Sequence, residues 1–246
     1  MKKRIDLLLL EKGLVSTRNK AQALVMSGQV LVNDQPVTKQ GQAVDENAAI
    51  RIRGEGCPYV SRGGLKLKGA IDSFKVDVKN KVALDVGAST GGFTDVLLQE
   101  GAVKVFAVDV GHNQLDWKIR KDARVIVIEK LNARNIEFNT IGQTVDIIVV
   151  DVSFISLQKV LPALLKFSGP NTDWITLIKP QFEAGREKVG KGGIVRSESD
   201  RIEVVERIKE VGESLGLARQ ALVESSIAGT DGNKEYLAHW KPGKIK

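Results

Sequence analysis

The stretch LDVGASTGGFTD, residues 84–95, decides the fold of the larger part of this 246-residue chain. It joins a β-rich run, residues 82–86, to an apolar helical pattern. Glycines directly after a strand let the backbone turn tightly and approach a ligand, and the N-terminus of the next helix stabilises negative charge. The stretch therefore predicts a nucleotide-like ligand at a strand-turn-helix junction. The alternative is a plain tight turn without a ligand.

The spacing of these glycines disfavours two common nucleotide motifs. The pattern G-x-G-x-x-G is broken by Ser89, and the lysine of a phosphate-binding P-loop is missing. A second β-rich run, residues 105–110, contains Asp109, about twenty residues after the glycine turn. In doubly wound folds an acidic residue at this spacing binds the ribose hydroxyls of the ligand. S-adenosylmethionine therefore fits better than NAD or ATP. The predicted cofactor-binding residues are Asp85, Gly87, Ala88, Ser89, Gly91, Gly92, Phe93, Thr94 and Asp109.

Outward from this motif, short β-rich runs alternate with helical patterns. The further runs lie at residues 125–128, 145–151 and 174–178, and a helix is expected over residues 64–74. Such alternation predicts an α/β fold, with a parallel sheet covered by helices on both faces. The tail, residues 221–240, predicts two further strands, antiparallel at the sheet edge.

The first quarter of the chain predicts a separate small α+β unit. One helical pattern ends at Gly13, and a second begins after the capping residue Thr17 and ends at Gly28. A hairpin is expected around the turn at residues 33–36, and a short strand over residues 49–52.

Charge separates the same two parts. The net charge is +7, and residues 1–68 hold 12 Lys plus Arg against 6 Asp plus Glu, leaving 25 against 24 for the rest. A small basic unit before a nearly neutral domain is typical of a nucleic-acid-binding module, although a solvated basic face without a partner is the alternative. Gly54, Gly56 and Pro58 predict a connector. We expect domains at residues 1–57 and 63–246, joined by a linker at residues 58–62.

Composition excludes several classes of protein. The 42% of hydrophobic and 27% of charged residues are typical of globular rather than disordered chains. A single cysteine, Cys57, forms no intramolecular disulfide. The apolar run at residues 7–10 is directly preceded by Asp6 and directly followed by Glu11. These charges favour an amphipathic helix over a signal peptide. No apolar run reaches the roughly 20 residues of a transmembrane helix. We expect a cytoplasmic protein without a metal site.

Motifs along the whole chain resemble a known family. The N-terminal segments RIDLLL, GLVSTR and ALVMSGQVLVN, which start at residues 4, 13 and 23, resemble the S4 RNA-binding domain. Residues 84–95 resemble motif I of class I methyltransferases, in the variant of FtsJ-like ribose methyltransferases. With VSRGGLKL, DVSFIS, IKPQFE and GNKEY, which start at residues 60, 151, 178 and 232, the chain resembles the TlyA family, whose members are often labelled haemolysin A.

The resemblance implies a class I, Rossmann-like methyltransferase sheet preceded by an S4-like RNA-binding domain. The implied reaction is S-adenosylmethionine-dependent 2′-O-methylation of a ribose, that of cytidine, in ribosomal RNA. The implied partners are ribosomal RNA or ribosomal subunits, with phosphate contacts from Arg4, Arg18, Lys20 and Arg62. A ribosome-binding module without turnover and a membrane-active haemolysin are the alternatives. Oligomeric state and target nucleotide stay open.

A ribose 2′-hydroxyl is a poor nucleophile, so a transferase needs a group that takes its proton. Lys179 ends a predicted strand, on the edge where open α/β sheets bind ligands, although it could instead bind an RNA phosphate. Asp151 would orient this lysine, although it could instead be a capping or structural carboxylate. Lys66 would supply a neighbouring cation, and Glu235 would hold Lys66 or the ribose. The resemblance assigns these four residues to the Lys-Asp-Lys-Glu tetrad of ribose methyltransferases and selects Lys66 over Lys68.

Two neighbouring features remain open. Residues 185–196 hold four glycines and four basic side chains, which predicts a loop that is mobile until substrate covers it and that could clamp RNA. A plain surface loop is the alternative. Phe154, beside a strand end, is either a stacking platform for a base or a core residue.

Overall fold

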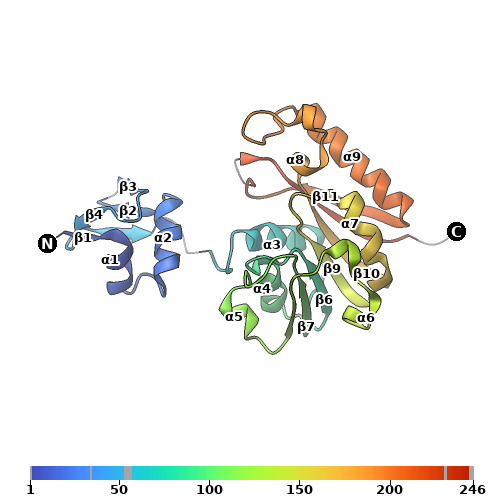
Figure 1. Cartoon of the computed structure of the whole chain (residues 1–246), viewed down its shortest axis with the longest axis horizontal. Coiled ribbons are helices and arrows are strands. Elements are labelled where there is room, and N and C mark those ends of the chain that lie inside the picture. Colours follow the sequence, from blue (N-terminus) through green and yellow to red (C-terminus); the bar gives the residue numbers. More distant parts are fainter. Residues whose placement is uncertain (1, 34, 53–56, 230–231, 244–246) are drawn as a thin grey trace. The chain divides into compact units, whose positions relative to one another are not determined.

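The computed structural model describes residues 2–33, 35–52, 57–229 and 232–243 of the chain. It divides into two compact units, Met1–Pro58 and Tyr59–Lys246, each described here by itself (Figure 1). Residues 59–62, predicted as linker, belong to the second unit, where the main-chain N–H of Val60 donates to Asp95 Oδ2 at 2.9 Å. Gly54 and Gly56 of the predicted connector lie outside the described residues.

The first unit packs two helices against short strands. Helix α2 (Arg18–Met26) is capped by Thr17, whose hydroxyl accepts from the N–H of Lys20, and Gly28 ends it with a φ of 68°. The predicted helices, hairpin and strand are confirmed, although Asp34 of the hairpin turn lies outside the described residues. The pairing of β1 with β4 was not predicted, because three-residue strands are too short to show alternation. The elements are β1 (Lys2–Arg4), α1 (Ile5–Glu11), α2, β2 (Val30–Val32), β3 (Gln35–Val37), β4 (Ala43–Asp45) and β5 (Ile50–Ile52).

The second unit is built on a seven-stranded sheet with the order β11-β12-β10-β9-β6-β7-β8. The five strands from β10 to β8 run parallel, while β12 and β11 are antiparallel at one edge, as predicted. The main difference is β10, which begins earlier than the predicted run. The strands are β6 (Val82–Val86), β7 (Lys104–Val108), β8 (Val125–Ile128), β9 (Val145–Val150), β10 (Ser168–Ile178), β11 (Leu217–Glu224) and β12 (Tyr236–Pro242).

Helices cover both faces of this sheet (Figure 1). Side chains alternate along each strand, so Leu84 packs into the core under α6, α7 and α9, whereas Ala83 packs into the core under α3, α4 and α5. The predicted doubly covered α/β fold is confirmed. No helix in the described ranges is both long and apolar enough to cross a membrane. The helices are α3 (Gly63–Phe74), α4 (Gly92–Gln99), α5 (Trp117–Arg120), α6 (Phe138–Ile141), α7 (Leu157–Leu164), α8 (Pro180–Glu183) and α9 (Glu198–Ser214), with short 3-10 turns η1 (Ala133–Asn135), η2 (Leu165–Phe167) and η3 (Arg186–Lys188).

Candidate active site

The candidate site lies at the carboxyl edge of the sheet. Strands β7, β6, β9 and β10 are parallel neighbours, so their C-terminal ends meet there. The residues that follow these ends are Asp109, Gly87, Asp151 and Lys179. Strand β12 runs the opposite way, with Tyr236 in register with Ile178, so Glu235 at its N-terminal end reaches the same edge.

The glycine turn after β6 has three residues in left-handed conformation. Gly87 has a φ of 87°, Ser89 of 47° and Gly91 of 96°. The carboxylate of Asp109 secures the turn, because it accepts from the N–H of Ser89 at 2.8 Å and from that of Gly111 at 2.6 Å. An ionised carboxylate has about four acceptor positions, so Asp109 retains capacity for ligand hydroxyls.

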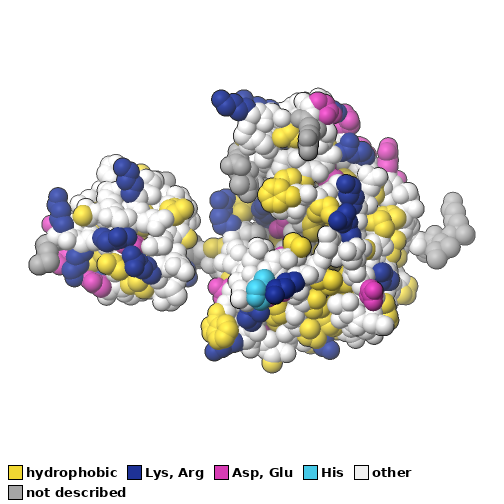
Figure 2. All heavy atoms as spheres, viewed as in Figure 1, with side chains coloured by type: hydrophobic (Ala, Val, Ile, Leu, Met, Phe, Trp, Pro, Cys, Tyr) yellow, Lys and Arg dark blue, Asp and Glu magenta, His cyan; other side chains and the backbone are white. Residues whose placement is uncertain are grey.

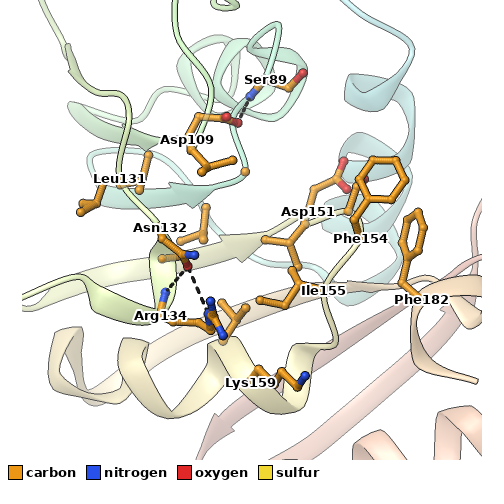
Figure 3. A pocket seen from close by; sticks show the side chains of 18 of the residues that line it. Ser89, Asp109, Leu131, Asn132, Arg134, Asp151, Phe154, Ile155, Lys159 and Phe182 are labelled. Carbon is orange, nitrogen blue, oxygen red and sulfur yellow. Dashed lines mark hydrogen bonds between the residues drawn. The ribbon is translucent and has the colours of Figure 1, made fainter.

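A cavity of about 770 Å³ opens beside this turn (Figure 3). Gly87, Ser89 and Asp109 line its one end, and the apolar side chains of Leu131 and Ile155 line its wall. Polar groups contribute too, namely Asn132, Arg134 and Lys159. A carboxylate with unused acceptor positions and several polar side chains, opposite an apolar wall, is a set of groups that could hold a nucleoside.

A smaller cavity of about 250 Å³ adjoins the first one. Both cavities are lined by Gly87, Ser89, Asp151 and Ser153, so their contents would be neighbours. The smaller one adds the two lysines of the predicted tetrad. The residues that line only it are Ser61, Gly63, Lys66, Ala88, Thr90, Gly92, Phe93 and Lys179.

Each of these lysines is paired with a carboxylate. Lys179 Nζ lies 2.5 Å from Asp151 Oδ1 and donates to Ser153 Oγ at 2.8 Å. Lys66 Nζ lies 2.5 Å from Glu235 Oε2. The two lysine side chains are only 11% and 12% exposed. The structure therefore brings the four predicted catalytic residues together, with Glu235 placed behind Lys66 rather than on the cavity wall.

Three predicted cofactor-binding residues lie behind the turn and line neither cavity. Asp85 is fully buried and accepts from the hydroxyl of Thr94 at 2.6 Å, which ties the end of β6 to the first turn of α4. Gly91 precedes that helix. Burial raises the pKa of Asp85 to about 7. These residues shape the turn from the protein side, whereas Gly87, Ala88, Ser89, Gly92, Phe93 and Asp109 line at least one of the cavities.

The substitution Asp85→Asn is expected to stabilise the second unit at alkaline pH. The folded-state pKa of about 7 lies above the ordinary value of 3.8, so the carboxyl contributes stability that is fully present below pH 3.8 and is lost as pH rises through 7. The neutral amide lacks this loss. The free energy of unfolding of the variant, relative to that of wild type, should therefore increase by about 2–3 kcal/mol from pH 5 to pH 8.5. Denaturant unfolding followed by tryptophan fluorescence measures this, and an equal difference at both pH values would contradict it.

Several residues that support the site were not singled out from the sequence. Glu183 is 9% exposed, and its Oε1 accepts from the main-chain N–H of Leu157 at 2.8 Å. It thereby ties the loop that carries Asp151 to α8, which follows Lys179. Gln181 donates to Glu235 Oε1 at 3.2 Å. Nothing in the local pattern distinguishes these residues from surface polar residues, because their partners lie far away in sequence.

The glycine-rich segment, residues 185–196, is held by hydrogen bonds. An isolated bridge joins Gly190 to Ile194, while the side chain of Asn233 accepts from Val195 N–H and donates to the carbonyl of Gly193. Lys188 is 2.6 Å from a carboxylate oxygen of Glu203 on α9. The Arg186 side chain lies outside the described residues. Clamping of RNA by this segment stays a prediction.

The predicted RNA-binding cations are distributed over both units. Arg4 and Arg18 meet at the buried carboxylate of Asp6, while Lys20 and Arg62 are exposed. Figure 2 shows Lys and Arg side chains on the visible face of the first unit. The sequence did contain a signal for Asp6, which lies three residues before the buried Leu9 and thus on the apolar face of α1.

The second unit has the fold of class I methyltransferases, and the first unit has two helices and two small sheets, which fits an S4 domain. Family models agree, since the FtsJ-like methyltransferase model matches residues 59–241 and the S4 domain model matches residues 3–50. The chain belongs to the FtsJ-like methyltransferase family, as motif I predicted.

Individual relatives confirm the resemblance to the TlyA family. The "16S/23S rRNA (cytidine-2'-O)-methyltransferase TlyA" of Mycobacterium tuberculosis (strain ATCC 25618 / H37Rv) is 41% identical, over 95% of this chain and 87% of its own. "Hemolysin A" of Brachyspira hyodysenteriae is 42% identical, over 96% of this chain and 99% of its own. The solved structure "Putative hemolysin from Streptococcus thermophilus" has 43% identity and a TM-score of 0.79, covering 99% of this chain and 89% of that one.

Proposed function

We propose that this protein transfers a methyl group from S-adenosylmethionine to the 2′-hydroxyl of a cytidine in ribosomal RNA. The observation that carries the proposal is the cavity with two carboxylate-paired lysines, which adjoins a cavity suited to a nucleoside. Membership of the FtsJ-like family and a relative named as an rRNA (cytidine-2'-O)-methyltransferase support it. Ribosomal RNA as substrate implies that the protein acts in the cytoplasm.

The residues of the larger cavity fit S-adenosylmethionine. Asp109 would accept from the ribose hydroxyls, and the glycine turn at Gly87 and Ser89 would let the methionine part approach the backbone closely. The apolar wall at Leu131 and Ile155 would enclose the adenine. The cofactor supplies an electrophilic methyl group on a sulfonium.

Lys179 would act as the general base. In its neutral form, Nζ would accept the proton of the 2′-hydroxyl, so that the ribose oxygen could take the methyl group that the cofactor would supply. Asp151, 2.5 Å away, and the hydroxyl of Ser153 orient the amine, and Asp151 compensates the ammonium that results. Lys66, held by Glu235, lines the same cavity and would orient the ribose.

An exposed aromatic ring, packed against a half-buried one, offers a place for the target base. Phe154 lines the larger cavity, is 90% exposed and has a φ of 64°, so it is not a core residue. Its ring centroid lies 4.9 Å from that of Phe182 (Figure 3). A bulky residue in the left-handed region costs about 1–3 kcal/mol, and such strain gathers at functional sites. An unpaired base of the RNA could stack on the exposed ring of Phe154.

Methyl transfer to ribosomal RNA tests the proposal directly. Purified protein, methyl-labelled S-adenosylmethionine and 16S and 23S ribosomal RNA, free or in subunits, are expected to yield label at the ribose of a cytidine. A 2′-O-methyl group blocks alkaline cleavage at its nucleotide, so partial alkaline hydrolysis maps the position. Cofactor binding without label on any of these RNAs would overturn the proposal in favour of a non-catalytic module. Lysis of erythrocytes by the purified protein would support the haemolysin alternative.

A further inference from the structure

Asp6 is a buried carboxylate that binds two arginines in the first unit. Its side chain is fully buried in the first turn of α1. Oδ1 accepts from Arg4 Nε at 3.0 Å, and Oδ2 accepts from Arg4 Nη2 at 3.0 Å and from Arg18 Nε at 3.1 Å. Gln22, one turn after Arg18 on α2, also donates to Oδ2, at 3.2 Å.

The two guanidinium groups remain accessible to solvent. The side chain of Arg4 is 47% exposed and that of Arg18 is 50% exposed. A guanidinium has five N–H donors, and Asp6 engages only Nε and Nη2 of Arg4 and Nε of Arg18. Two cations against one anion leave the cluster positive. The outward donors of both groups therefore face solvent from fixed positions.

The hydrogen bonds of Asp6 differ from those of an ordinary carboxylate in the first turn of a helix. A carboxylate in the first turn of a helix usually stabilises the unpaired N–H groups or the helix dipole. The hydrogen bonds of Asp6 go instead to side chains from two elements that flank the helix start, Arg4 before α1 and Arg18 on α2. Free arginine side chains lose rotamer freedom on binding, which opposes binding. Asp6 has already restricted both of them, and preorganisation of this kind strengthens binding.

We propose that Asp6 is a positioning residue for RNA, whose buried carboxylate holds Arg4 and Arg18 as a paired guanidinium site for backbone phosphate. The inference rests on the proposed function, since it takes RNA as the ligand. Planar guanidinium forks match the geometry of phosphate oxygens. The arginines contact the RNA, and Asp6 acts through them.

The substitution Asp6→Asn in the full chain separates positioning from charge. It raises the formal net charge from +7 to +8, so electrostatics alone predicts tighter RNA binding. We expect affinity for transcribed 16S or 23S ribosomal RNA to fall about tenfold, because both arginines become mobile. Filter binding at about 0.15 M salt measures this. The matched control is Asp45→Asn, which makes the same charge change at an exposed residue of β4 and is expected to leave affinity equal or higher.

Coupling to the arginines provides the second criterion. In a background of Arg4→Gln plus Arg18→Gln, Asp6→Asn should no longer weaken binding. The inference is overturned if Asp6→Asn binds ribosomal RNA as tightly as Asp45→Asn, or if it weakens binding equally in both backgrounds. If Asp6→Asn unfolds the first unit, Arg4→Lys plus Arg18→Lys replaces it, because charge is kept while the planar forks are lost. Wild-type affinity of that variant would also overturn the inference.

The same measurements distinguish this inference from the proposed function. If the wild-type protein methylates ribosomal RNA but Arg4→Gln plus Arg18→Gln leaves the affinity for RNA unchanged, only the role of Asp6 is overturned. Wild-type protein that neither binds nor methylates ribosomal RNA would overturn both.

Discussion

Replacing Lys179 by methionine is expected to lower the rate of methyl transfer by about 10²–10⁴-fold, the usual contribution of a general base. Lys179 Nζ is held 2.5 Å from Asp151 Oδ1 and 2.8 Å from Ser153 Oγ, and a methionine removes the amine that would take the proton at this position. Affinity for S-adenosylmethionine should stay near the wild-type value, because Lys179 does not line the larger cavity. Single-turnover transfer and equilibrium dialysis of the cofactor measure the two effects.

A second variant decides between proton transfer and phosphate binding by Lys179. Arginine binds phosphate well and does not lose its proton in proteins, so Lys179→Arg should be as impaired as Lys179→Met if the lysine is the base. Activity close to wild type in Lys179→Arg would show that the residue serves as a cation. Lys209→Met on α9, whose lysine pairs with Glu206 away from both cavities, is the matched control and should transfer at the wild-type rate.

Gly87→Ala is expected to abolish measurable cofactor binding and to destabilise the second unit by about 2–5 kcal/mol. Two effects add here. The φ of 87° is unfavourable for any residue with a Cβ, and a Cβ at this position would overlap the main-chain carbonyl of Asp151. The end of β9 must then move away from the turn, and Asp151 lines both cavities.

Gly142→Ala is the matched control for this prediction. Gly142 has a φ of 75° as the residue after α6, but a Cβ there would have no atom within 4 Å. It therefore carries the backbone strain without the overlap, and about 1–2 kcal/mol of destabilisation with unchanged cofactor binding is expected. Denaturant unfolding and calorimetric titration with S-adenosylmethionine compare the two variants. Equal effects of both on stability and cofactor binding would contradict the role given to the close approach at Gly87.

The elements of the fold could be predicted because their signals are local. The glycine turn follows a β-rich run and precedes an apolar helix, and β6 (Val82–Val86) and β8 (Val125–Ile128) have the predicted bounds. Boundaries differed where polar residues continue a strand. Residues 168–173 of β10 include glycine, proline and asparagine, which local pattern assigns to turns.

The position of the site could be predicted from the sequence more completely than the residues that compose it. Strand ends in an α/β sheet predict ligand-binding residues, which drew attention to Asp109, Asp151 and Lys179. Asp85 and Thr94, predicted as cofactor-binding, line neither cavity, because the side chain of Asp85 points into the protein and is fully buried. The sequence pattern of α1 shows Asp6 only as an interruption of an apolar run.

The sequence alone predicted the strand-turn-helix motif, the two-part organisation and the family. These depend on backbone conformation and motif spacing, which are set by residues close together in the chain. The pairing of Lys66 with Glu235, 169 residues apart, depended on the tertiary structure. It arises because β12 returns antiparallel beside β10, which brings the start of one strand to the ends of its parallel neighbours. The same holds for Asp6, whose two arginines converge only when α1 packs against α2.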